Sequence, residues 1–201
     1  MHRRSLTVIG LLVILALPLS ASQFIDMPFD QVASESRYIV RGTIGQSWSA
    51  WDNAHEVIYT YATVRVNRYF GETTGPDTLM IREVGGTVDG YTQEAIGFPV
   101  IRSGQDVVLM LSQWEDGADF RIHGYNQGKY MVGHRNNREV LTADPERQGE
   151  AHVATTREGG RIQTTSADEL PSMSIDEFAQ MVNDARAGRA TGSGLGRAQQ
   201  Q

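Results

Sequence analysis

Segments that alternate between apolar and polar residues follow one another along much of this chain, with no helical pattern between them. Tyr38 to Trp51 alternates with a period of two, and Glu56 to Phe70 is rich in the β-branched and aromatic residues that favour strands. Thr78 to Val84 has the same character. Successive strands without crossover helices predict a mainly β fold, either a small antiparallel barrel or a β-sandwich. The long first hairpin favours an OB-like barrel.

A fourth strand is predicted to be buried on both faces. The segment from Asp106 to Ser112 contains a continuous apolar run, Val107 to Leu111. It is short and lies between Gly104 and Gly117, so a buried strand fits it better than a helix does. Shorter strands are expected at Asp119 to Gly124, Lys129 to Val132 and Glu139 to Thr142.

One amphipathic helix is predicted near the C-terminus. Ser174 and Glu177 have the spacing of a capping box, in which each side chain accepts a hydrogen bond from the backbone of the other. Apolar residues then recur at helical spacing, at Ile175, Phe178, Met181, Val182 and Ala185. This helix should end near Gly188 and pack on the barrel. A further helical turn is expected at Gln31 to Glu35.

The N-terminus has the pattern of a secretory signal peptide. A basic start, His2 to Arg4, precedes an apolar run from Leu6 to Leu19, and small residues follow at Ser20 to Ser22. The run of about 14 residues is shorter than the roughly 20 that span a bilayer. We expect a cleaved signal peptide at 1–22 and an exported protein, periplasmic or extracellular, with no membrane span after cleavage. An uncleaved anchor and a buried core helix are the alternatives.

Composition divides the remaining chain into four parts. Residues 23–143 form the predicted β-barrel domain, and residues 144–172 are polar and are expected to form a linker. The C-terminal helix occupies 173–188, and the segment 189–201 is rich in Gly, Ala and Gln, which predicts a disordered tail.

Charge and cysteine content exclude several classes of function. The net charge is −6, and removal of Arg3 and Arg4 with the signal makes it more negative. Such a chain is a poor candidate for binding nucleic acid, whose phosphates need a basic surface. The absence of cysteine excludes disulfides, a lipoprotein anchor, thiolate catalysis and thiolate metal sites.

No sequence motif in this chain identifies a chemical reaction. Gly45 to Ser49 begins like a nucleophile elbow but lacks the final glycine. Asp52, His55 and Glu56 cluster in a predicted hairpin loop and could hold a metal, but solvated polar groups of a loop are the favoured interpretation. We therefore assign no catalytic residue, metal or cofactor. The expected function is a non-catalytic binding module for another exported protein. The alternative is an exported enzyme whose active-site residues are dispersed along the sequence.

Aromatic residues of the first hairpin form one candidate binding surface. If the loop spans residues 52–55, Trp51 lies opposite Glu56 and Trp48 lies opposite Tyr59. The period of two then places Trp48, Tyr59 and Tyr61 on one face. These rings could form a platform for a carbohydrate or a protein, or they could cover the barrel core.

The connection from Gly85 to Gln105 is the other candidate. It shows little regular pattern and is longer than ordinary connections, which is typical of functional or disordered loops. Tyr91, Phe98 and Ile101 could anchor a partner at this end of the barrel. The alternative is that the segment packs on the barrel mouth, with Phe98 and Ile101 as a plug.

Three short motifs stand out in the β region. They are Tyr38 to Gly42; Gly85-Gly86 followed by Gly97-Phe98-Pro99 and Gly104 to Leu111; and Gly124 to Tyr130. With these motifs the chain resembles a group of uncharacterised exported bacterial proteins. From Phe29 to Thr142 the strand order is also distantly similar to the netrin-like module of tissue inhibitors of metalloproteinases, which implies an OB-type barrel. Those inhibitors chelate zinc through an N-terminal cysteine that this chain lacks, so their mechanism does not carry over.

Overall fold

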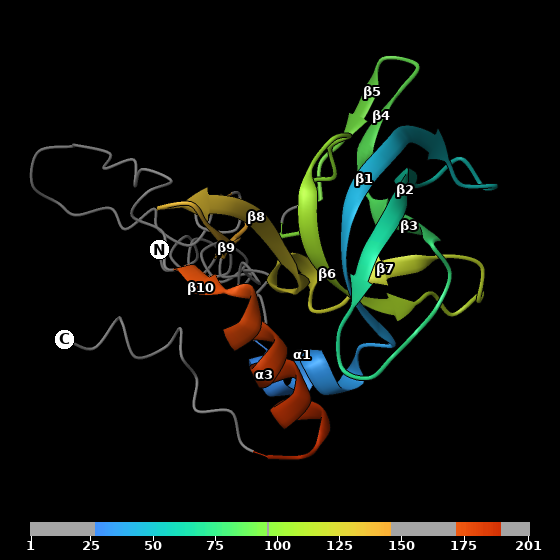
Figure 1. Ribbon diagram of the computed structural model, residues 1–201. Helices are drawn as coiled ribbons and strands as arrows, with labels where there is room; N and C mark the ends of the chain where they lie inside the picture. The colour runs from blue at the N-terminus through green and yellow to red at the C-terminus, as the bar shows by residue number, and fades with distance from the viewer. Residues whose placement is uncertain (1–26, 96, 146–171, 190–201) are drawn as a thin grey trace, which may run out of the picture.

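The computed structural model describes residues 27–95, 97–145 and 172–189 (Figure 1). The predicted signal peptide, almost all of the predicted linker and all but the first residue of the predicted tail lie outside these residues. The elements, in chain order, are α1 (Phe29–Glu35), β1 (Tyr38–Trp51), β2 (Ile58–Tyr69), β3 (Thr78–Val84), β4 (Gly86–Val88), β5 (Tyr91–Gln93), β6 (Asp106–Gln113), β7 (Phe120–Ile122), the 3-10 helix η2 (Tyr125–Gly128), β8 (Lys129–Arg135), β9 (Arg138–Ala143), β10 (Ser172–Ser174) and α3 (Ile175–Arg186).

Five strands close into a small barrel, which confirms the predicted OB-like fold class. β1 pairs antiparallel with β2 on one side and with β6 on the other, β2 pairs with β3, and β6 pairs with β7. The barrel closes where β3 and β7 run parallel, at Ile81 and Phe120. The sandwich alternative does not apply, because β1 pairs with β6 as well as with β2, which closes the strands β1, β2, β3, β7 and β6 into a ring.

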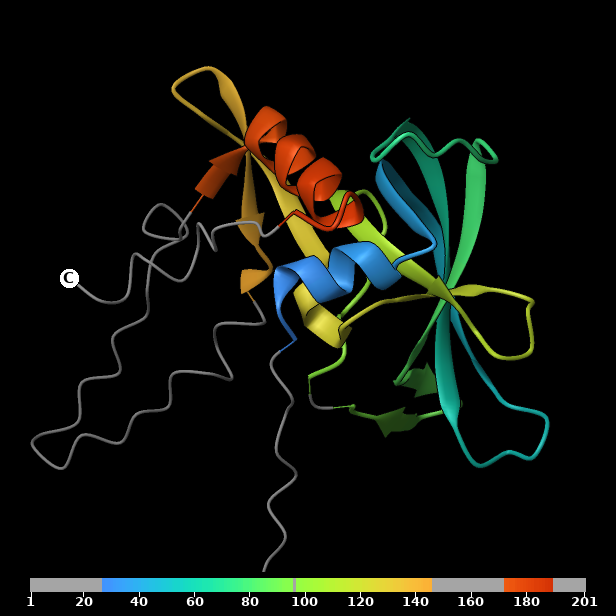
Figure 2. The same cartoon turned by 90° about the horizontal axis from the view of Figure 1, so that it is seen from below.

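Strand β6 is buried on both faces because it separates two cores. Val107, Leu109 and Leu111 point into the barrel, whereas Val108 and Met110 belong to a second core beneath the helices. β6 also pairs with β8, so the sheet continues outside the barrel through β8, β9 and β10. Helices α1 and α3 lie side by side against this extension (Figure 2). The apolar run predicted this double burial correctly.

The C-terminal helix has the predicted capping box. The Ser174 hydroxyl accepts a hydrogen bond from the Glu177 backbone at 3.1 Å, and the Glu177 carboxylate accepts one from the Ser174 backbone at 2.8 Å. Phe178 then fills the second core, where its ring meets three others edge-on. Their centroids lie 5.3–5.8 Å away, in Phe29, Phe70 and Tyr130. Helix α3 is therefore part of the folded domain.

Arg41 ties the barrel to the sheet extension. Its guanidinium donates to Asp106 of β6 at 2.9 Å and to both carboxylate oxygens of Glu139 on β9, at 2.9 and 2.7 Å. A planar guanidinium suits such paired contacts.

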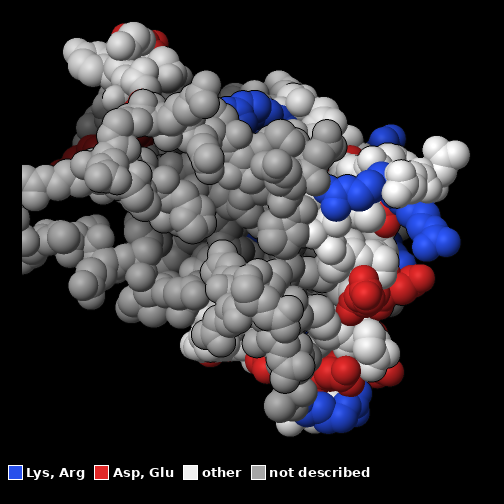
Figure 3. Space-filling view, turned by 90° about the vertical axis from the view of Figure 1, so that its left-hand side faces the viewer, with Lys and Arg blue, Asp and Glu red and all other residues white. Residues whose placement is uncertain are grey.

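On the side of the molecule that carries β8, β9 and β10, basic and acidic side chains lie close together over the described surface (Figure 3).

The chain contains a single lysine, and it is buried. Lys129 is 1% exposed, forms an ion pair with the buried carboxylate of Asp144 at 2.9 Å and donates to the Val100 carbonyl. These contacts hold together the connection before β6, the start of β8 and the chain after β9. Nothing in the local sequence distinguishes this lysine from a surface residue.

Glu83 is another buried ionisable group, and it strengthens the closure of the barrel. Along β3 the side chains alternate, so Arg82 points outward while Glu83, 2% exposed, points inward. The Glu83 carboxyl accepts a hydrogen bond from the backbone N–H of Ile122 in β7. Because β3 and β7 share only one residue pair, this side-chain contact supplies a second link across the closure. Burial raises the pKa of Glu83 to about 8.

The loop of the first hairpin is two residues longer than predicted. Trp51 lies opposite Ile58 rather than Glu56, and Trp48 lies opposite Tyr61, two residues beyond its predicted partner. A shift of one residue would move every side chain to the other face, whereas a shift of two preserves the face. The predicted partners are therefore wrong, but the predicted face is kept.

The connection from Gly85 to Gln105 contains regular structure that the sequence pattern does not show. β4 and β5 form a short hairpin at the end of the barrel. Gly86 has a φ of 139° and lies so close to the side chains of Ser49 and Thr60 that a Cβ atom would collide with both. Strands of three residues are too short to establish a period of two, which explains why they were not predicted.

Candidate functional site

Four aromatic rings lie in a row outside the barrel, and we call them the aromatic strip: Trp48, Tyr61, Tyr59 and Trp114. Trp48 stacks on Tyr61 with centroids 5.7 Å apart and planes at 11°. Tyr59 meets Tyr61 and Trp114 in edge-on contacts at 6.4 and 5.8 Å. Neither of the two cores includes these rings, and Trp48 is 41% exposed. They cover the outer face of the barrel.

The positions on β2 explain why the strip faces outward. Ile58 and Ala62 are fully buried, so the residues that alternate with them, Tyr59 and Tyr61, point away from the interior. Trp48 shares their face through its pairing with Tyr61. The structure thus brings together the three residues that the sequence placed on one face.

Two arginines lie over the rings of the strip. The Arg82 guanidinium lies 4.8 Å from the Trp114 ring and 5.2 Å from the Tyr59 ring, and Arg121 lies 5.1 Å from Trp114. The Trp114 indole donates to the Arg82 carbonyl at 2.9 Å, and Asp116 accepts from the Arg82 guanidinium at 2.6 Å. These contacts fix the side chains of the strip in place, so a ligand would meet an ordered surface.

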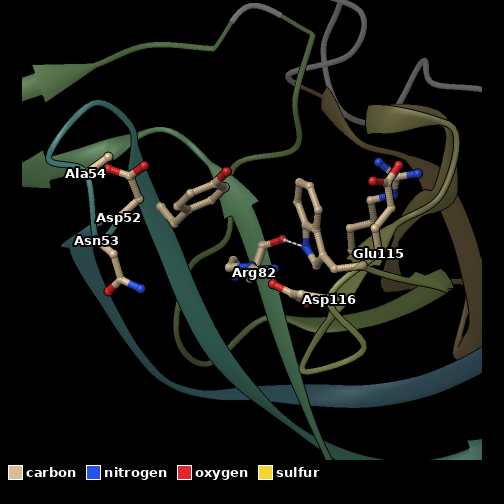
Figure 4. A pocket seen from close by; sticks show the side chains of 9 residues that line it. Asp52, Asn53, Ala54, Arg82, Glu115 and Asp116 are labelled. Atoms are coloured by element: carbon tan, nitrogen blue, oxygen red, sulfur yellow. Dashed lines mark hydrogen bonds and ion pairs between the residues drawn. The ribbon is translucent and has the colours of Figure 1, made fainter.

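The strip ends in an open depression between two loops. The depression has a volume of about 500 Å³, within the range of roughly 300–1,000 Å³ that is typical of ligand pockets. One wall is the loop after β1 and the other is the loop after β6, with the outer face of β3 between them. The labelled lining side chains in Figure 4 are Asp52, Asn53 and Ala54 on one side, Arg82 in the middle and Glu115 and Asp116 on the other.

Asp52 shapes the first of these loops. Its Oδ1 atom accepts hydrogen bonds from the backbone N–H groups of Glu56 at 2.7 Å and Val57 at 3.1 Å. The hydrogen bonds from Val57 and Glu56 lower the pKa of the Asp52 carboxyl. Asp52 is therefore ionised at neutral pH, and its contacts account for the loop being longer than predicted.

The second loop is also acidic. It contains Glu115, Asp116 and Asp119, of which Glu115 and Asp116 line the depression. The hydrogen bond from Arg82 lowers the pKa of the Asp116 carboxyl. Glu115 is exposed at the rim. The depression thus combines aromatic rings, two arginines and ionised carboxylates.

The candidate metal ligands in the first hairpin loop do not converge. Within the described part of the chain, no group of three or more His, Asp or Glu side chains could hold a metal ion. Asp52 is engaged with the loop backbone, and the ring of His55 lies 6.1 Å from that of Trp51. These positions are explained by loop structure.

The residues predicted at the barrel end do not form one exposed surface. Tyr91 is 66% exposed and meets the ring of Trp51 at 5.9 Å. Phe98 is half-buried and packs edge-on against Tyr125 at 5.0 Å. Ile101 is 8% exposed and belongs to the barrel core, so it takes the plug role instead of that of an exposed anchor.

Sequence reasoning missed Trp114, Arg82 and Arg121. These residues lie on three separate segments. The pairing of β2 with β3 brings Arg82 beside Tyr59, whereas the closure of the barrel brings Trp114 to Tyr59 and Arg121 to Trp114. The pattern of β3 does indicate that Arg82 points outward, but it does not indicate which ring the guanidinium covers. Long-range strand pairing carries that information.

The protein is an OB-like barrel with an open depression between the loop after β1 and the loop after β6. Comparison of the chain with protein-family models, with curated proteins and with solved structures finds no match. None of the helices in the described residues is long and apolar enough to cross a membrane. The likeness to exported barrel proteins and to the netrin-like module stays a prediction.

Proposed function

We propose that this protein is an exported, non-catalytic binding module that recognises another protein through the aromatic strip and the adjoining depression. One observation carries the proposal: four rings and two arginines are held in order outside both cores. Tryptophan, tyrosine and arginine dominate the binding energy of protein interfaces. OB-type barrels bind oligonucleotides and oligosaccharides on the corresponding face and through the corresponding two loops.

The chemistry of the depression favours binding over catalysis. Arg82 is paired with Asp116, and Asp52 is bonded to its own loop, so these groups have structural partners. The carboxyl with the large pKa shift, Glu83, points into the barrel interior, away from the depression. An enzyme that uses acid or base catalysis needs titratable groups that converge on its substrate.

A carbohydrate ligand is the second candidate. The nearly parallel stack of Trp48 on Tyr61 offers a flat apolar surface, which suits the face of a sugar ring as well as a side chain. A glycan would make few contacts with the arginines, because Arg82 is already paired with Asp116.

Arrays of immobilised peptides and glycans, probed with the purified protein, test the proposal. We expect binding to peptides that is lost in Trp48→Ala and kept in Tyr91→Ala. Tyr91 is the matched control because it is an exposed aromatic residue outside the strip. Loss in Tyr91→Ala alone would move the site to the barrel end, glycan binding alone would favour the carbohydrate, and no binding to either would refute the proposal.

A further inference from the structure

The two loops that border the depression carry more acidic than basic groups. Three carboxylates line the depression, Asp52, Glu115 and Asp116, against Arg82 and Arg121 on the neighbouring strands. The same two loops also carry Glu56 and Asp119. The lining carboxylates lie on both sides of the depression, and both arginines lie close to the ring of Trp114. The surface at the end of the aromatic strip is therefore negative overall.

The arginines are largely compensated within the protein. Arg82 donates to Asp116 at 2.6 Å and lies 3.8 Å from Asp119, while its guanidinium covers Trp114. Arg121 stacks on the same indole and donates to the Ser112 hydroxyl at 3.3 Å. An anionic group entering the depression would have to compete with these partners, whereas a cation would meet Asp52 on one side and Glu115 on the other.

We propose that the partner segment inserts a basic side chain, an arginine or a lysine, into the depression between the loops 52–57 and 114–119. This inference rests on the proposed function, and it names the chemistry of the partner: an extended segment with an apolar residue for Trp48 and a cation for the depression. Charge complementarity of this kind speeds association and selects the partner. The contribution of an exposed pair is modest, so the rings supply most of the affinity.

Matched peptides test this inference. Peptides of equal apolar content are compared with arginine, with the neutral isostere citrulline or with glutamate at one position, by fluorescence anisotropy at 50 and 500 mM NaCl. We expect the arginine peptide to bind tightest and to lose its advantage at high salt. Glu115→Gln should weaken binding of the arginine peptide about two- to fivefold, the range for an exposed ion pair, and leave the citrulline peptide unchanged.

Asp176→Asn is the control for net charge, because Asp176 lies at the exposed start of α3. It should leave both peptides unaffected. Equal binding of the arginine and citrulline peptides, or tighter binding of the glutamate peptide, would overturn this inference while leaving the proposed function standing. If no peptide binds the wild-type protein, both proposals fall.

Discussion

Replacing Glu83 by glutamine should change how the stability of this protein depends on pH. Glu83 is 2% exposed inside the barrel, and its carboxyl accepts a hydrogen bond from the Ile122 backbone. Burial raises the pKa of Glu83 from its ordinary value of 4.5 to about 8, although the Ile122 hydrogen bond and the charge of Arg121 act in the opposite direction. The folded protein therefore holds a proton on Glu83 at neutral pH.

The sign of the effect follows from this difference in proton binding. In the unfolded chain Glu83 loses its proton near pH 4.5, whereas in the folded protein it keeps the proton until about pH 8. The free energy of unfolding should then fall as the pH rises through this window, by up to about 1.4 kcal/mol per pH unit. Between pH 4.5 and about pH 8, the free energy of unfolding should fall by at most roughly 5 kcal/mol in total.

Glutamine keeps an oxygen acceptor for the Ile122 N–H and cannot ionise. In Glu83→Gln the contribution of this position to the pH dependence should disappear. The free energy of unfolding of the variant should therefore rise relative to that of the wild type as the pH increases from 5 to 8. Urea unfolding followed by tryptophan fluorescence at several pH values measures the difference. Glu72→Gln, at an exposed loop position, is the control. Parallel pH profiles for the wild type and Glu83→Gln would refute this reasoning.

Three further predictions concern the buried lysine, the barrel end and the N-terminus. Lys129→Met should lower the free energy of unfolding by about 3–5 kcal/mol, because it breaks the buried ion pair between Lys129 and Asp144; a urea midpoint equal to that of the wild type would contradict this. Ile101→Ala should lower the free energy of unfolding by about 2–5 kcal/mol because it opens a cavity in the core, whereas Tyr91→Ala should change it little. A thermal melt in which Tyr91→Ala is the less stable variant would contradict this. Mass spectrometry of the exported protein should find its N-terminus near residue 23, and an intact Met1 would argue against a cleaved signal peptide.

The strands and the C-terminal helix could be predicted because their signals are local. The alternation in β1 and β2, the apolar run in β6 and the Ser174 capping box each lie within one segment of sequence. The face shared by Trp48 and Tyr61 was predictable for the same reason, although the hairpin register was not. Asp52 favours a turn at this position, but that preference does not specify that its backbone hydrogen bonds extend the loop to Val57.

The remainder of the candidate site depends on contacts between distant segments. Trp114 reaches Tyr59 and Arg82 only because β6 and β7 close the barrel against β3. The burial of Lys129 depends in the same way on Asp144 and on the carbonyl of Val100, which lie at different places in the chain. A single sequence shows which residues can make such contacts and does not show which of them meet.

The three tryptophans allow a direct test of where the protein binds its partner. Trp48 and Trp114 lie in the aromatic strip, whereas Trp51 contacts Tyr91 beside the β4–β5 hairpin. In a two-dimensional ¹⁵N–¹H spectrum, their indole N–H groups give three separate signals that can be followed during titration with the tightest-binding peptide from the array. We predict that the signals of Trp48 and Trp114 shift and that the signal of Trp51 stays nearly unchanged. A shift of the Trp51 signal alone would contradict the account.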